Sequence, residues 1–120
     1  MPELTEGMHA GEFIASEANG SRSREVVTID TGDLVAGQVL GVITASGKYV
    51  AFNQDAVDGS EVAAAILYDN TDASTADQEA VAIVRDAEVN GNDLTWPSDI
   101  EDAEKTAAIA QLAELGVIVR

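Results

Sequence analysis

Few side chains in this sequence are of the types that carry out catalysis. The chain has a single histidine and no cysteine, so a Ser–His–Asp triad, a Cys–His pair and a cysteine zinc site all lack members. The histidine, His9, lies in a polar leading segment, where a catalytic base would lack fixed geometry. Paired carboxylates are the one remaining route to hydrolysis. We therefore expect no enzyme, metal or cofactor, and keep a carboxylate hydrolase as a remote alternative.

Two acidic loops have a superficial likeness to calcium-binding loops. They read DAVDGSE at residues 55–61 and DNTDASTAD at residues 69–77. An EF-hand needs oxygen-bearing side chains at alternating positions, and Val57 and Ala73 interrupt that pattern. The segment TASGK at residues 44–48 lacks the upstream glycine of a phosphate-binding loop. All three segments are better interpreted as turns.

The charge balance limits the partners. With 22 acidic and 6 basic residues the net charge is −16, which repels both nucleic acid and anionic membranes. The acidity is equally typical of a highly soluble protein or of one adapted to a salty medium. Apolar residues form 46% of the chain but aromatic ones only 4%, which predicts a thin core. Self-association would add burial, so we expect an oligomer.

The first 24 residues differ in character from the rest. They combine glutamate and glycine with no sustained periodicity, which predicts a flexible N-terminal arm unpaired within its own domain. Phe13 and Ile14 form its apolar island, and such a segment can add a strand to the sheet edge of a partner. Disorder with a chance apolar pair is the alternative. Residues 25–120 are predicted to form one β-rich body.

Within the body the pattern predicts several short strands. A tight hairpin at Ser46–Gly47 is the clearest turn, because glycine adopts positive φ without steric cost. Glycines 32 and 37 mark a further turn, and residues 69–79 read as a loop. The expected strands are residues 25–30, 38–44, 48–52, 62–70, which form a buried apolar run, 79–89 and 117–120.

A helix is predicted between Pro97 and Gly116. Ser98 followed by Glu101 has the spacing of a capping box, and Gly116 is a typical helix stop. The helix would present Ile109, Leu112 and Leu115 to a sheet. The predicted fold class is α+β and mainly β, a compact single domain of short strands and hairpins with one C-terminal helix after a flexible arm.

The order of these segments resembles a known family. The segments are AGQVLGVITASGKYVAF, DGSEVAAAIL, EAVAIVRDAEVN and LTWP, preceded by EFIASEANGSRSREVVTI and followed by the helix and LGVIVR. Together they resemble the head decoration protein family of lambda-like tailed bacteriophages over nearly the whole chain. No single segment is a chemically specific motif, so the resemblance depends on their order.

The resemblance implies a non-enzymatic protein made in the host cytoplasm and located on the outer capsid surface of the virion. It implies a homotrimer that binds the major capsid protein at local three-fold positions of the expanded head and cements the shell against internal DNA pressure. It also implies that the N-terminal arm pairs with capsid backbone. The candidate capsid-binding residues are Glu12, Phe13, Ile14, Ala15, Ser16, Gly20, Arg22, Ser23 and Arg24.

Two further interpretations concern single residues. Arg22 and Arg24 are placed to meet acidic groups where arm joins body, although they are equally typical of a solvated linker. Trp96 and Pro97 are candidates for the trimer interface or for the core, and a core position beneath the helix is favoured. The alternative function is a small acidic monomeric β-rich binding module for a soluble ligand.

Overall fold

The computed structural model describes residues 14–17 and 23–120, and of Ser16 and Glu17 only the backbone. Within these ranges the chain forms ten strands, a 3₁₀ helix and one α-helix. In order they are β1 (Ile14–Glu17), β2 (Arg24–Ile29), β3 (Gly32–Leu34), β4 (Val39–Val42), β5 (Tyr49–Ala51), β6 (Ala65–Leu67), β7 (Thr71–Ala73), β8 (Gln78–Ile83), β9 (Ala87–Val89), η1 (Gly91–Asp93), α1 (Asp102–Glu114) and β10 (Val117–Val119). The predicted mainly β fold with one C-terminal helix is confirmed.

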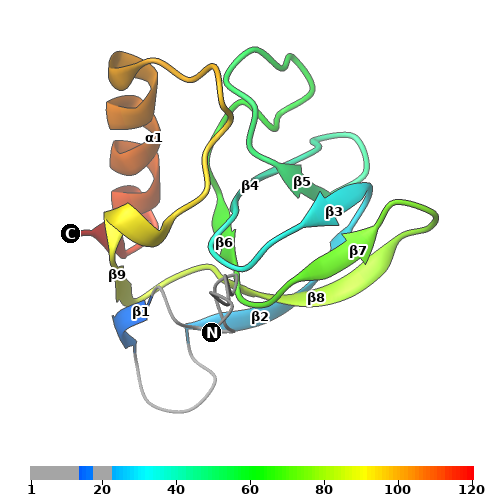
Figure 1. Cartoon of the computed structure of the whole chain (residues 1–120), viewed down its shortest axis with the longest axis horizontal. Coiled ribbons are helices and arrows are strands. Elements are labelled where there is room, and N and C mark those ends of the chain that lie inside the picture. The colour runs from blue at the N-terminus through cyan, green and yellow to red at the C-terminus, as the bar shows by residue number, and fades with distance from the viewer. Residues whose placement is uncertain (1–13, 18–22) are drawn as a thin grey trace, which may run out of the picture.

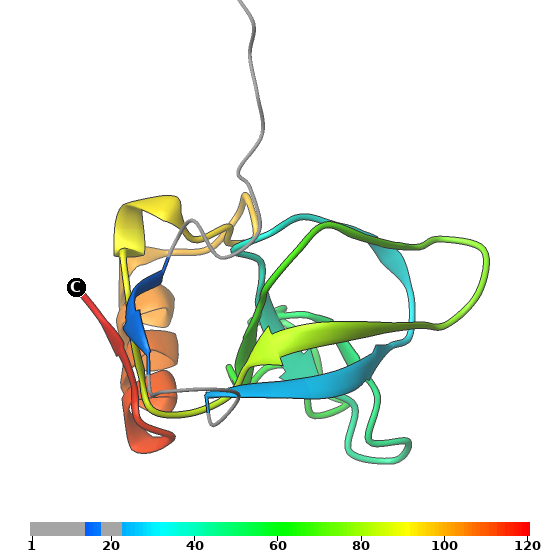
Figure 2. The same cartoon turned by 90° about the horizontal axis from the view of Figure 1, so that it is seen from below.

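A small closed barrel forms one side of the molecule. Its strands follow the order β2-β5-β4-β6-β8, and β3 and β7 pair as a separate two-stranded sheet. The other side consists of α1 and a three-stranded sheet of order β1-β9-β10, as Figures 1 and 2 show. The N-terminal and C-terminal strands thus lie on either side of β9.

Two hydrophobic clusters fill the molecule. One lies inside the barrel and includes Val27, Ile29, Leu40 and Leu67, and the other lies between the barrel and the helix-bearing layer. Successive residues of a strand point to opposite faces, so β6 sends Ala65 and Leu67 into the barrel and Ile66 into the second cluster. The continuous apolar run that predicted a buried strand is explained, because both faces of β6 are covered.

The hairpin between β4 and β5 forms as predicted. Gly47 has a φ of +73°, and its N–H donates to the Ile43 carbonyl at 2.8 Å. The Ile43 N–H donates to the Lys48 carbonyl, also at 2.8 Å, and the two strands then pair antiparallel. The turn fixes the register that places Leu40 in the barrel core.

The single strand predicted over residues 79–89 is wrong, because the chain breaks it into β8 and β9. β8 ends at Ile83 in the barrel, and β9 begins at Ala87 in the other sheet. Asp86, between them, has a φ of +51° and is the one non-glycine residue with positive φ among those described. Arg85 and Asp86 interrupt the apolar pattern at this corner, but two charged residues do not by themselves distinguish a change of sheet from an exposed part of one strand.

The helix begins later than its predicted capping box. Glu101 is the N-cap, and its N–H donates to the Glu104 carboxylate at 3.0 Å, so the box is formed by Glu101 and Glu104 and not by Ser98. Gly116 ends the helix as predicted, with a φ of +88°. The packed face is centred on Ala108 and Leu112.

Three smaller expectations differ from the structure. Leu115, expected on the packed helix face, is 43% exposed. The segment predicted as a loop over residues 69–79 contains β7, and the glycine-rich turn after β2 contains β3. Each of these two strands has three residues and pairs only with the other, so neither has the length of a periodic pattern.

Candidate functional site

The N-terminal strand β1 is paired within the molecule. It runs antiparallel to β9, with Ile14 opposite Val89 and Glu17 opposite Ala87, and the register is irregular between Ile14 and Ser16. Ile14 is half-buried and packs against the cluster between barrel and helix. The expectation that residues 1–24 are unpaired within their own domain is therefore wrong for this strand. The pairing is favoured because β1 covers an edge of β9 whose backbone groups would otherwise be exposed.

The candidate capsid-binding residues fall into two groups. Ile14, Ala15 and Ser16 lie on β1, and the Ala15 side chain is exposed. Ser23 and Arg24 lie where the described chain resumes at the start of β2. The remaining candidates lie outside the described residues; these are Glu12, Phe13, Gly20 and Arg22.

Ser23 anchors the start of β2 to the corner between β8 and β9. Its side chain is fully buried, and its Oγ donates to the Asp86 carbonyl at 2.8 Å. The Val84 N–H donates to the Ser23 carbonyl at 2.9 Å, so the serine is bonded on both sides of the corner. The chain that follows β1 is thereby tied to the barrel at a fixed point.

Arg24 lies over an aromatic ring. Its guanidinium carbon is 4.3 Å from the centroid of the Tyr68 ring, within the range of a cation–π contact. From the sequence we predicted acidic partners for Arg24, and nothing in it indicated a contact with Tyr68. No local signal joins these two residues, because they are 44 positions apart and meet only through the barrel.

An apolar surface adjoins this contact on the outer wall of the barrel. Val26 is 62% exposed and lies directly opposite Val81 in the β2–β8 ladder. A shallow cavity of about 200 Å³ is lined here by Arg24, Glu25, Val26, Tyr68 and Val81, which we call the barrel-wall patch. Arg85 adjoins it, with Nη2 3.4 Å from Glu25 Oε1. The sequence analysis did not identify this surface.

Trp96 packs between the barrel and the helix. Its ring meets Phe52 edge to face, with centroids 6.1 Å apart and planes at 87°, and Lys105 Nζ lies 5.8 Å from the Trp96 centroid. The side chain is half-buried against the cluster there. Trp96 therefore contributes to the core while part of it reaches the surface, and an interface role stays a prediction.

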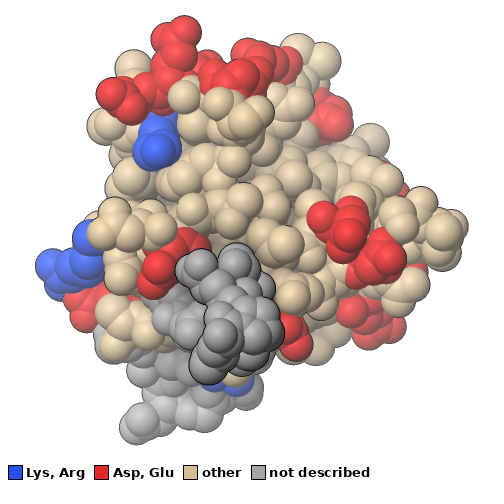
Figure 3. Space-filling model, in the orientation of Figure 1, with Lys and Arg blue, Asp and Glu red and all other residues tan. Residues whose placement is uncertain are grey.

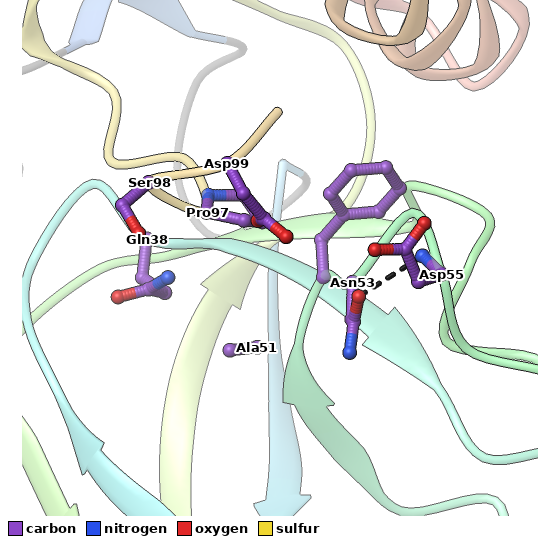
Figure 4. Close-up of a pocket in the computed structure, with 8 residues that line it drawn as sticks. Gln38, Ala51, Asn53, Asp55, Pro97, Ser98 and Asp99 are labelled. Atoms are coloured by element: carbon purple, nitrogen blue, oxygen red, sulfur yellow. Dashed lines mark hydrogen bonds between the residues drawn. The ribbon is translucent and has the colours of Figure 1, made fainter. Parts of the chain in front are cut away.

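Pro97 lines a polar cleft between the barrel and the segment that leads to α1. The cleft has a volume of about 410 Å³, and Figure 4 shows the side chains around it. Asp99 Oδ1 accepts from Gln54 Nε2 at 3.1 Å, and the Asp55 N–H donates to Asn53 Oδ1 at 3.0 Å. The lining residues are Gln38, Ala51, Phe52, Asn53, Asp55, Pro97, Ser98 and Asp99.

The chemistry of this cleft is limited. Its lining includes two aspartates and one serine but neither histidine nor cysteine, so it contains no Ser–His or Cys–His pair. Across residues 14–17 and 23–120, no group of three or more His, Cys, Asp or Glu side chains is placed to hold a metal ion. In the same ranges no helix is long and apolar enough to cross a membrane.

The carboxylates whose pKa is perturbed stabilise turns. Hydrogen bonds from Ser60 hold the pKa of Asp58 below its usual value, and Ser74 does the same for Asp72. The hydrogen bond to Asp77 raises the pKa of Lys48. In Figure 3, Asp and Glu lie mainly along the top and on the right of the visible face, and a zone without charged side chains lies between these groups.

Fold and surface together define a small barrel protein whose candidate functional features are contact surfaces and an edge strand. The bacteriophage lambda head decoration protein D family matches residues 3–117, so the chain belongs to this family. No curated protein sequence matches the chain. The resemblance seen in the sequence is confirmed, and the chain is a phage head decoration protein, a structural component of the capsid.

Proposed function

We propose that this protein binds as a homotrimer to the outer surface of the expanded phage head, at local three-fold positions. There it contacts the major capsid protein and stabilises the shell against the pressure of packaged DNA. It acts without catalysis and without a cofactor, and it joins the head after synthesis in the host cytoplasm. The family match over residues 3–117 is the observation that carries this proposal.

The edge position of β1 supports a contact through backbone pairing. In the β1-β9-β10 sheet, β9 pairs with one side of β1, and no described strand pairs with its other side. An edge strand presents N–H and C=O groups to which an extended partner segment can add. In our proposal a capsid strand pairs along residues 14–16, and residues 1–13 extend the contact. In this proposal the hinge between β1 and the barrel consists of Gly20, Arg22, Ser23 and Arg24.

Three copies of such a contact act together. A four-residue strand offers few hydrogen bonds, and each contributes only about 0.5–1.5 kcal/mol net in water. On a trimer, engagement of one strand raises the effective concentration for the next two. Weak individual contacts then give firm attachment to a shell with matching three-fold geometry.

Two truncations test the contact. Deletion of residues 1–17 removes β1 and all that precedes it, and deletion of residues 1–13 keeps β1 as the matched control. Each protein is mixed with expanded and unexpanded capsids, and the decorated particles are imaged. We expect the 1–17 deletion to remain a trimer and leave expanded capsids bare, and the 1–13 deletion to retain part of the binding. Unaltered binding by the 1–17 deletion would reject the role of β1.

Sedimentation of the full chain tests the trimer separately. A chain that stays monomeric at tens of micromolar would contradict the homotrimer and favour the monomeric binding module. A trimer that decorates neither form of the capsid would contradict the site of action. The two failures are distinct, because the first is seen without capsids.

A further inference from the structure

Strand β2 has apolar residues on both faces, yet only one face is buried by the described chain. Val27 and Ile29 point into the barrel, whereas Val26, next in line on the outer face, is 62% exposed. β6 is apolar at every position, and there both faces are covered; the outer face of β2 carries Val26 between Arg24 and Thr28. A strand that is apolar on both faces is typical of one covered on both sides.

The exposed valine belongs to a continuous surface. Val81 lies opposite Val26 across the ladder, and Tyr68 lies beside them beneath the Arg24 guanidinium. Tyrosine and arginine are enriched where protein–protein contacts contribute most of their energy. The barrel-wall patch therefore has the composition of a contact surface as well as its shape.

Charge indicates the kind of partner that fits this surface. The chain carries only 6 basic residues against 22 acidic ones; Arg24 lines this patch, and Arg85 adjoins it through its ion pair with Glu25. Copies of a chain with a net charge of −16 repel one another over most of their surface. They repel least where an arginine-bearing apolar surface of one copy meets an acidic surface of another.

We propose that the barrel-wall patch is the surface through which one copy of this protein packs against the next. This inference rests on the proposed function for the number of copies in the assembly. In a closed trimer each contact is heterologous, so the patch of one copy meets a different surface of its neighbour. Val26 enters that interface, and Arg24, over the Tyr68 ring, faces acidic groups of the neighbouring copy.

A second exposed valine does not combine these features. Val57 is 97% exposed, but it lies on the loop that carries Asp55 and Asp58, where a second copy would meet like charge. It is therefore a matched control for Val26. The two positions have the same side chain, both are largely exposed, and both accept the same substitution.

The test compares Val26→Glu with Val57→Glu in the full chain by sedimentation over a range of concentrations. We expect Val26→Glu to weaken each contact by at least about tenfold, which lowers the association constant of the trimer by about a thousandfold over three contacts. Val57→Glu should assemble as the wild type does. Circular dichroism should show both variants folded, because neither side chain is in the core.

A milder variant covers the case in which Val26→Glu does not fold. Val26→Thr keeps the shape and β-propensity of the side chain and replaces one methyl group with a hydroxyl, and it should weaken assembly while leaving the circular dichroism spectrum unchanged.

Four outcomes decide between the explanations. Loss of the trimer in Val26→Glu alone would support the proposal. A wild-type trimer that Val26→Glu leaves intact would overturn it without affecting the proposed function. An intact Val26→Glu trimer that no longer binds capsids would overturn it too, since the patch would then face the capsid. A monomeric wild type would overturn both this proposal and the trimer of the proposed function.

Discussion

Gly41 is the position where one added methyl group should be most damaging. It lies in β4 opposite Val50, at a point where the backbone of residues 58–60 crosses the strand. A Cβ at this position would lie 2.5 Å from the Ser60 carbonyl oxygen and 2.6 Å from its Cα. These are backbone atoms, so rotation of a side chain cannot relieve the overlap.

The free energy lost in Gly41→Ala follows from how firmly Ser60 is held. Ser60 Oγ donates to Asp58 Oδ1 at 2.6 Å, and the Asn53 N–H donates to the Ser60 carbonyl at 3.1 Å. Ordinary contact begins near 3.4 Å, so the two backbones must separate by about 0.9 Å. Overpacking of this kind costs about 1–3 kcal/mol, and the anchored backbone places Gly41→Ala near 3 kcal/mol. For a chain of this size that lowers the unfolding temperature by about 10–15 °C.

Gly47→Ala is the control. No atom lies within 4 Å of the Cβ it would add, but Gly47 has a φ of +73°, so the substitution costs only the backbone strain of about 1 kcal/mol. Thermal and urea unfolding of both variants can be followed through the fluorescence of the single tryptophan, Trp96. If Gly41→Ala is within about 0.5 kcal/mol of wild type, or is less destabilising than Gly47→Ala, the steric argument is wrong.

Two further predictions concern the helix and a charged turn. Leu112→Ala should lower the free energy of unfolding by about 3 kcal/mol, because the Leu112 side chain is fully buried. Leu115→Ala should change it by less than about 1 kcal/mol, because the Leu115 side chain is 43% exposed. Urea unfolding measures both, and equal effects would contradict the observed helix face. The pKa of Asp58 is lowered in the folded chain, chiefly by the Ser60 hydroxyl, so its stabilising effect is present above the pKa of the unfolded chain and is lost as the pH falls through the folded one. Unfolding measured from pH 6 to pH 2 should show a smaller loss of stability in Asp58→Asn than in wild type, and parallel curves would refute this.

Local patterns predicted the elements whose signals lie within a few residues. The Ser46–Gly47 hairpin, the glycine stop at residue 116 and the buried β6 run were all predicted correctly. In each case neighbouring residues determine the conformation, through the φ that glycine permits or through continuous apolar character. The capping box was shifted by three residues because Ser98 and Glu101 have the same spacing as Glu101 and Glu104.

Long-range features were the ones that sequence reasoning missed. The corner at Asp86 depends on Ser23, 63 residues away, and the patch depends on Tyr68 meeting Arg24 across the barrel. The pairing of β1 with β9 joins residues that are at least 70 positions apart. The periodicity of one segment gives no information about such a contact. The apolar pair at residues 13–14 was therefore assigned to a partner protein, although Ile14 pairs with Val89 of its own chain.

The low aromatic content of this chain follows from the way its two clusters share strands. β4, β6 and the end of β8 form a common wall, so their successive residues must fill two narrow spaces on opposite sides. Alanine, valine, leucine and isoleucine fill these strands, and Phe52, the buried ring among the described residues, lies just after β5 and outside this wall. Each cluster is then small, and a single chain buries little apolar surface for its length. The described chain leaves the outer valine of β2, Val26, 62% exposed, and in our proposal a second molecule covers it. In our proposal such a fold completes its burial by assembly, which is the physical reason to expect that the barrel wall and not the acidic loops brings copies together.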